Sequence, residues 1–130
     1  MGFSAAWDDK DTQTVMRFRA EGVWNWNDYH KAVRMAMFTL HKHDKPVDVI
    51  VDLSGTDHLP GGALAHVRSF GKRLNPNMTG RAVVIDLDAD TERALLAGND
   101  ARLLRHGEQT IYFVDSDAEA RALLNVLQAE

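Results

Sequence analysis

The stretch VDVIVDLSGTDHLPGGALAHVRSFGKRL, residues 47–74, decides the fold class of this chain. Residues 47–53 form an apolar run typical of a strand buried in a sheet, and a turn rich in Gly, Ser and Pro follows it. From Pro60 or Gly61 to Leu74, apolar residues recur at the helical period, which predicts an amphipathic helix. A strand that leads through a turn into a helix is typical of α/β proteins, and ligands often bind at this junction.

The rest of the chain predicts strands and helices on both sides of this stretch. Residues 3–7 and 13–21 predict two strands, joined into an antiparallel hairpin by the polar turn at residues 8–11. A helix is predicted to begin at Asn25 or Asn27 and to end before Pro46. The later elements are a strand at 81–87, a helix from 91 to about 105 interrupted near Gly98, a strand at 111–114, and a final helix opened by a capping box at 116–119. The order ββαβαβαβα predicts an α/β fold with three parallel strands at the end of the chain and the hairpin attached to them.

Length, charge and composition exclude several classes of protein. A chain of 130 residues suits a single domain, residues 1–130, and its net charge of -4 argues against a nucleic-acid partner. The absence of cysteine excludes disulfides, thiolate catalysis and cysteine-bound metals. The first residues do not resemble a signal peptide, and no stretch approaches the ~20 apolar residues of a membrane span. We therefore expect a cytoplasmic protein.

Aspartates follow three of the predicted strands. Asp52, Asp86 and Asp115 would share one edge of a parallel sheet, and Asp88 and Asp90 alternate with Asp86 along the chain. Carboxylate oxygens are the ligands that Mg²⁺ prefers. One alternative is therefore an Mg²⁺-dependent phosphoryl-transfer or hydrolytic enzyme that uses Asp52, Asp86 and Asp88. In the other interpretation these aspartates only cap helices and solvate loops.

The turn after residue 53 contains most of the candidate binding residues. It lacks the lysine and the glycine spacing of nucleotide-binding loops. The backbone amides of Gly61, Gly62 and Ala63 could still receive an anion or a hydroxyl at the start of the helix, unless Thr56 or Asp57 caps it. The candidate ligand- or partner-binding residues are Ser54, Thr56, Asp57, His58, Leu59, Gly61, Gly62 and Arg68.

The first predicted helix has two apolar residues, Met35 and Phe38, on the face where lysines and arginines indicate solvent. They are either covered by Trp24 or the amino-terminal segment, or they form a surface for self-association. Together with Trp24 they are the candidate interface residues of an expected homodimer. The six histidines and the serines show no motif of nucleophilic catalysis, because the pattern GxSxG is absent.

Three segments resemble the STAS domain. VDVIVDLSGTDHLPGGAL at 47–64 and FVDSDAEARALL at 113–124 resemble this family, and GVWNWNDY at 22–29 is similar to a G-x-W-x-W-x-D pattern of bacterial single-domain SpoIIAA-like proteins. The resemblance extends from about Gln13 onward. It implies the mixed sheet with packed helices of anti-sigma-factor antagonists and of the cytoplasmic tails of sulfate transporters.

In the signalling members of this family, the loop reads approximately D-L-S-G-x-x-x-x-D-S-S-G-L, and the serine after the second aspartate is phosphorylated. Pro60 and Gly61 occupy these two positions here, so the resemblance does not extend to a phosphorylation switch, and Ser54 and Thr56 are not equivalent to that serine. It implies a non-catalytic binding or regulatory module, without a cofactor, that presents the loop and the next helix to a protein partner or small ligand. A small carrier of apolar ligands such as lipids is a further alternative, since STAS domains resemble lipid-binding folds.

Overall fold

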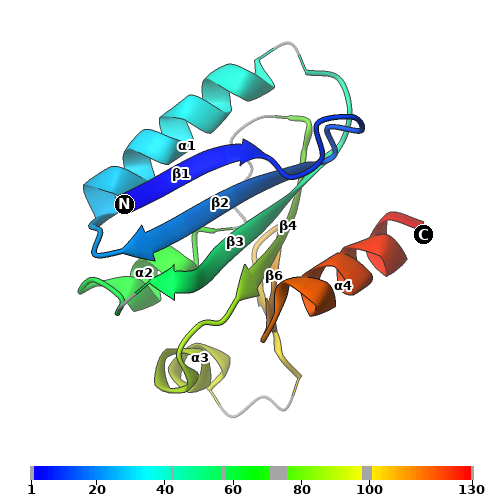
Figure 1. The fold of residues 1–130 in the computed structure, drawn as a ribbon. Coiled ribbons are helices and arrows are strands. Elements are labelled where there is room, and N and C mark those ends of the chain that lie inside the picture. Colours follow the sequence, from blue (N-terminus) through cyan, green and yellow to red (C-terminus); the bar gives the residue numbers. More distant parts are fainter. Residues whose placement is uncertain (1, 42, 57, 71–75, 98–100, 130) are drawn as a thin grey trace.

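The computed structural model describes residues 2–41, 43–56, 58–70, 76–97 and 101–129. These residues form one mixed sheet and the helices packed against it (Figure 1). The elements in chain order are β1 (Gly2–Trp7), β2 (Val15–Gly22), α1 (Trp26–Leu40), β3 (Val47–Thr56), α2 (Ala63–Val67), β4 (Met78–Ile85), α3 (Ala89–Leu96), β5 (Leu103–His106), β6 (Gln109–Val114) and α4 (Asp117–Ala129).

The strand order in the sheet is β1-β2-β3-β4-β6-β5. The four inner strands are parallel neighbours, and β1 and β5 pair antiparallel at the two edges. Residues of α1, α2 and α3 pack on one face of the sheet, and α4 packs on the other (Figure 1). The mixed α/β fold predicted from the sequence is confirmed. Among the described helices, none has both the length and the apolar character needed to cross a membrane.

Strand β3 lies in the middle of the core, as its apolar run predicts. Val49 and Val51 face α1 together with Leu53, whereas Ile50 faces α4. All of these side chains are buried, because helices cover both faces of a parallel sheet.

Helix α2 is shorter than the predicted helix at residues 60–74. It ends at Val67, and the hydroxyl of Ser69 donates to the carbonyl of His66 at 2.7 Å, so this serine satisfies a carbonyl at the end of the helix. Leu64, expected on the buried face, is 43% exposed. Residues 71–75, which include the rest of the predicted helix, lie outside the described residues.

The prediction of a helix at residues 91–105 is wrong for its second half. Helix α3 already begins at Ala89, since Asp88 is its N-cap, and Ala97 ends it in a left-handed conformation with φ 49°. Residues 103–106 form β5, which is antiparallel to β6. The turn between them contains Gly107 at φ 62°, a conformation that glycine adopts without strain.

A buried carboxylate joins β3 to its neighbours on the α4 face. Asp48 is 1% exposed and accepts two hydrogen bonds from Arg81, from Nε at 2.9 Å and from Nη2 at 3.1 Å. The amide of Gln128 on α4 donates to it at 2.9 Å, and the hydroxyl of Thr79 donates as well. These bonds compensate for removing the charge from water, and they connect β3, β4 and α4.

We predict that Arg81→Ala destabilises the protein by about 3 kcal/mol, because it leaves Asp48 buried without its opposite charge. The measurement is the free energy of unfolding in urea. Arg93→Ala is the control, since Arg93 pairs with Asp90 on the exposed surface of α3 and should cost less than about 0.5 kcal/mol. Equal losses in the two variants would contradict the role assigned to Arg81.

Candidate functional site

Two tryptophans hold the loop that follows β3. The indole Nε1 of Trp24 donates to the hydroxyl of Thr56 at 2.5 Å, and Nε1 of Trp26 donates to the carbonyl of Gly61 at 2.7 Å. The two bonds therefore fix the chain just before and just after residues 58–60. Trp24 lies just before α1 and Trp26 is the first residue of α1, and each is more than thirty residues earlier in the sequence than its acceptor.

The same segment contains the cap of α1. Asn25, one of the two predicted N-caps, accepts from the backbone N–H of Asp28 at 3.0 Å, and the carboxylate of Asp28 accepts from the backbone N–H of Asn25 at 3.1 Å. Asn25 lies between the two tryptophans in the chain, and Asp28, the other member of this capping box, follows Trp26. The motif GVWNWNDY thus both starts a helix and provides the donors that position a distant loop.

An aromatic stack holds α2 against the beginning of α1. The ring of His66 lies 4.0 Å from that of Trp26, with 6° between their planes, and Phe70 and Tyr29 pack beside them. Nδ1 of His66 bonds to the carbonyl of Gly62 at 3.0 Å. Burial raises the pKa of Tyr29, while a hydrogen bond with Ser69 opposes this rise. The loop and α2 therefore pack on α1 as one unit.

The structure brings part of the predicted binding set together. Thr56, Gly61 and Gly62 surround the two indoles, and Leu59 packs against the core. His58 and Arg68 are exposed on the same stretch, and Arg68 comes four residues after the exposed Leu64 of α2. Asp57 lies outside the described residues. Ser54 belongs elsewhere, because its hydroxyl donates to Asp52 at 2.6 Å.

The predicted cap and anion site at the start of α2 are not supported by the geometry. The N-cap is Gly62, at φ 83° and without a side-chain cap, whereas the hydroxyl of Thr56 bonds to Trp24 and to the carbonyl of His58. Helix α2 has only 5 residues. A helix of a single turn carries little of the macrodipole on which the expected anion site depends.

The apolar patch predicted on α1 is present in part. Phe38 is 82% exposed and Met35 is 64% exposed, and Met37, expected on the buried stripe, is 45% exposed. Trp24 was predicted to join this interface, and this prediction is wrong. Its ring is buried, 4.9 Å from the ring of Phe3, because its indole has to reach Thr56 beneath the loop.

Charged side chains form a network on the α4 face of the sheet. Arg17 on β2 donates to Asp8 at 2.8 Å, to Asp52 at 3.1 Å and to Asp117 on α4. Arg121 bonds to Asp8 at 2.9 Å and to Asp117 at 2.8 Å. The hydrogen bond from Arg121 lowers the pKa of Asp117, against the opposing effect of burial. Asp52 is therefore part of a structural ion-pair network.

The aspartates of the enzymatic alternative do not assemble into a metal site. Asp52 is engaged by Arg17 and Ser54, and Asp88 accepts from the backbone N–H of Thr91 as the cap of α3. Asp86 is exposed, with φ 62°. Within the described part of the chain, no three His, Asp or Glu side chains are grouped so that they could hold an ion. For Asp88, the interpretation as a helix cap is confirmed.

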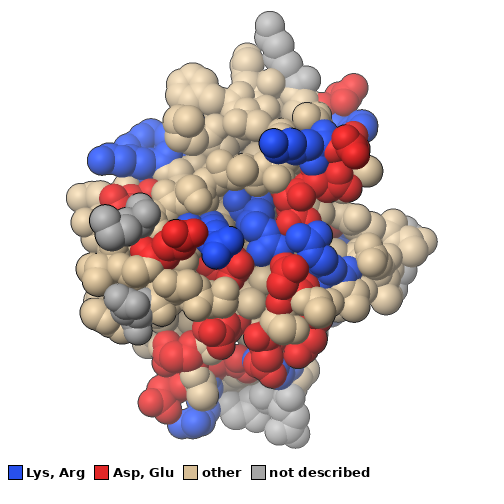
Figure 2. Space-filling view, viewed as in Figure 1, with Lys and Arg blue, Asp and Glu red and all other residues tan. Residues whose placement is uncertain are grey.

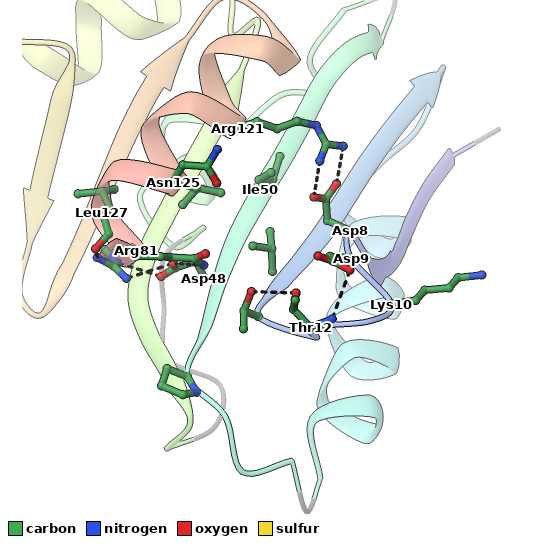
Figure 3. Close-up of a pocket in the computed structure, with 15 residues that line it drawn as sticks. Asp8, Asp9, Lys10, Thr12, Asp48, Ile50, Arg81, Arg121, Asn125 and Leu127 are labelled. Atoms are coloured by element: carbon green, nitrogen blue, oxygen red, sulfur yellow. Dashed lines mark hydrogen bonds and ion pairs between the residues drawn. The ribbon is translucent and has the colours of Figure 1, made fainter. Parts of the chain in front are cut away.

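A groove of about 940 Å³ opens between α4, the first half of β3 and the turn after β1 (Figure 3). Figure 3 shows Arg121 reaching from α4 to Asp8 and Arg81 lying against Asp48. Both arginines are thus already bound to carboxylates. Figure 2 likewise shows basic and acidic side chains interleaved over the middle of this face. An incoming ligand would meet charges in the groove that are already paired with one another. We therefore place the candidate site at the loop after β3 and at α2.

Sequence analysis did not find the groove or the indole bonds. The groove combines residues from positions 8 to 128, and the only local signal is Asp48 inside an apolar run. The bond from Trp26 ends on a backbone carbonyl, which has no sequence signature. The resemblance of GVWNWNDY to a family pattern was the one available signal that these tryptophans act together.

We predict that Trp26→Phe loosens α2, because phenylalanine keeps a ring under His66 but cannot donate to Gly61. Amide exchange of His66 and Arg68 should become faster, and unfolding should cost about 1 kcal/mol less. Hydrogen exchange measured by NMR tests this. Trp7→Phe is the control, since Trp7 packs against His43. Unchanged exchange in α2 would show that the indole bond does not hold this segment.

No protein-family model matches the chain, and neither does any curated protein. A solved structure does. The crystal structure of an uncharacterised protein of the DUF3478 family with a SpoIIAA-like fold, from Shewanella loihica PV-4, aligns with 95% of this chain and 94% of its own, at a TM-score of 0.62 and 17% identity. Similarity at this identity establishes the fold. The chain therefore has the SpoIIAA-like fold of STAS domains, as the sequence resemblance predicted.

Proposed function

We propose that the protein is a non-catalytic STAS-like binding module of the cytoplasm that presents the loop after β3 and α2 to a protein partner. The observation that carries this proposal is the pair of indole bonds, from Trp24 to Thr56 and from Trp26 to Gly61. A loop held in one conformation before binding loses less conformational entropy when a partner docks. An ordered loop at a strand end is thus suited to recognition.

The chemistry of the exposed side chains supports a protein partner. Leu64 is 43% exposed, Arg68 is exposed four residues after it, and His58 is exposed on the loop. An apolar side chain next to arginine is a common composition of protein interfaces, where arginine is enriched. Because Pro60 and Gly61 replace the aspartate and serine of the signalling relatives, we propose that this recognition does not depend on phosphorylation of the loop.

Two observations favour this function over the alternatives. The carboxylate of Asp52 is bonded to Arg17 and Ser54, which makes it a poor candidate for a metal ligand or base. The groove on the α4 face combines apolar side chains such as Leu124 with the ion pairs of Arg121 and Arg81, whereas a carrier of apolar ligands needs predominantly apolar walls. The loop after β3, by contrast, is attached at Thr56 and at Gly61 by the two indole bonds.

Photo-crosslinking in the native cells tests the proposed surface. Benzoylphenylalanine in place of Leu64 should yield a discrete adduct with one protein, because the probe would lie inside the interface. The same probe in place of Val126, which is 61% exposed on α4, is the control and should not yield that adduct. Arg68→Glu, added to the Leu64 probe, should reduce the adduct several-fold.

The crosslinked protein should then bind the purified module in calorimetry and lose affinity with Arg68→Glu. Two outcomes contradict the proposal: no adduct from position 64, or the same adducts from positions 64 and 126. Adducts from position 126 alone would move the recognition surface to α4.

We further propose that the module forms a homodimer through the exposed apolar residues of α1. Phe38 is 82% exposed and Met35 is 64% exposed, and burying both would remove two large apolar side chains from water. The double variant Met35→Glu, Phe38→Glu should sediment as a monomer at concentrations where the parent protein sediments as a dimer. Val126→Glu on α4 serves as the control. If parent and double variant sediment identically, this surface does not mediate self-association.

A further inference from the structure

Two histidines from different helices meet beside the loop. The ring centroids of His30 on α1 and His66 on α2 are 5.6 Å apart, and their planes are tilted by 53°. His30 has no role in the recognition surface proposed above, and His66 contributes to it only by holding α2 against Trp26. His30 is exposed, whereas His66 is half-buried against Trp26.

This separation suits two imidazoles that share one metal ion. A tetrahedral ion bound at ~2.0 to 2.1 Å by one nitrogen of each ring places the two ring centroids about 5 Å apart. The observed 5.6 Å differs from this by an amount that a small rotation of a surface side chain removes. Since His30 lies at the exposed face of α1, its ring has room for that rotation.

The hydrogen bond of His66 gives its ring the proton arrangement of a metal ligand. Its Nδ1 lies 3.0 Å from the carbonyl oxygen of Gly62, and because a carbonyl only accepts hydrogen bonds, the proton must be on Nδ1. In the neutral ring, Nε2 then carries the free lone pair. A metal-binding histidine usually donates the N–H of its other ring nitrogen to a carboxylate, a backbone carbonyl or a water molecule. Stacking on Trp26 at 4.0 Å fixes the plane of the ring.

We infer that His30 and His66 form a binding site for a divalent transition-metal ion of the zinc type, with water in the remaining positions. Imidazole nitrogen suits Zn²⁺, whereas Mg²⁺ and Ca²⁺ require oxygen. No further His, Asp or Glu joins the pair in the part of the chain that the structure describes, so the ion is held by two protein ligands and exchanges readily. It links α1 to α2 and braces the loop after β3 from its outer side.

Calorimetric titration of the full chain with ZnCl₂ tests the site. One ion should bind per chain, and long-range ¹H–¹⁵N spectra should show the Nε2 signal of His66 shifting. His30→Ala should weaken binding about tenfold or more, since the second imidazole otherwise binds intramolecularly. His41→Ala is the matched control, because His41 is also exposed and lies at the end of the same helix. It should leave the affinity unchanged.

A second variant separates metal binding from packing. His66→Phe keeps a flat ring over Trp26 while removing both nitrogens, so it should remain folded by circular dichroism and lose the ion. The inference is overturned if the full chain takes up no Zn²⁺, if His30→Ala binds it as tightly as the parent, or if His41→Ala weakens binding to the same extent. None of these results depends on the partner, so the metal site and the proposed recognition surface succeed or fail separately.

Discussion

The structure depends on the burial of β3 on both of its faces. This strand places two aspartates, Asp48 and Asp52, in buried positions, at 1% and 7% exposure. A buried carboxylate is tolerated only with charged or polar partners close by. Arg81 and Gln128 supply them for Asp48, and Arg17 supplies one for Asp52. These partners lie on β4, α4 and β2. The interactions that compensate the two buried charges of β3 therefore also determine how the neighbouring strands and α4 are placed.

The other face of β3 has no charges to neutralise and is packed against α1. The same strand then leads into the loop that the two tryptophans hold, and these tryptophans lie at the start of α1, Trp24 just before it and Trp26 as its first residue. The helix that closes the apolar core therefore also sets the position of the candidate site. Core packing and site geometry are coupled through the segment at residues 22–29, and the resemblance of this segment to a family pattern has a structural explanation.

The features that the sequence predicted well are those that local physics determines. An apolar run at residues 47–53 predicts a strand covered on both faces, and Asn25 with Asp28 forms the cap that its position indicates. The exposure of Phe38 follows from its place among basic residues on one side of a helix. In each case the deciding interactions are within a few residues.

The features that were missed depend on residues far apart in the chain. Asp48 alternates with valines and so resembles a solvent-exposed position of a strand. Its burial depends on its partners Arg81 and Gln128, which are 33 and 80 residues away in the sequence. In β5, Leu103 and Leu104 are also compatible with a continued helix. The turn at Gly107 and the pairing with β6 make this segment a strand. The aspartates of the supposed metal site were grouped by strand ends, without knowledge of the arginine that engages Asp52.

The bond from Trp26 to Gly61 has a consequence for how this protein can change. Its acceptor is a main-chain carbonyl, a group that every amino acid carries, so the attachment does not prescribe which side chains stand at residues 58–60. Mutations there can alter what the loop recognises while its anchorage is conserved. Descendants of one ancestral sequence can then acquire different partners without redesigning the scaffold, and the loop is also a natural place to graft new binding sequences by engineering.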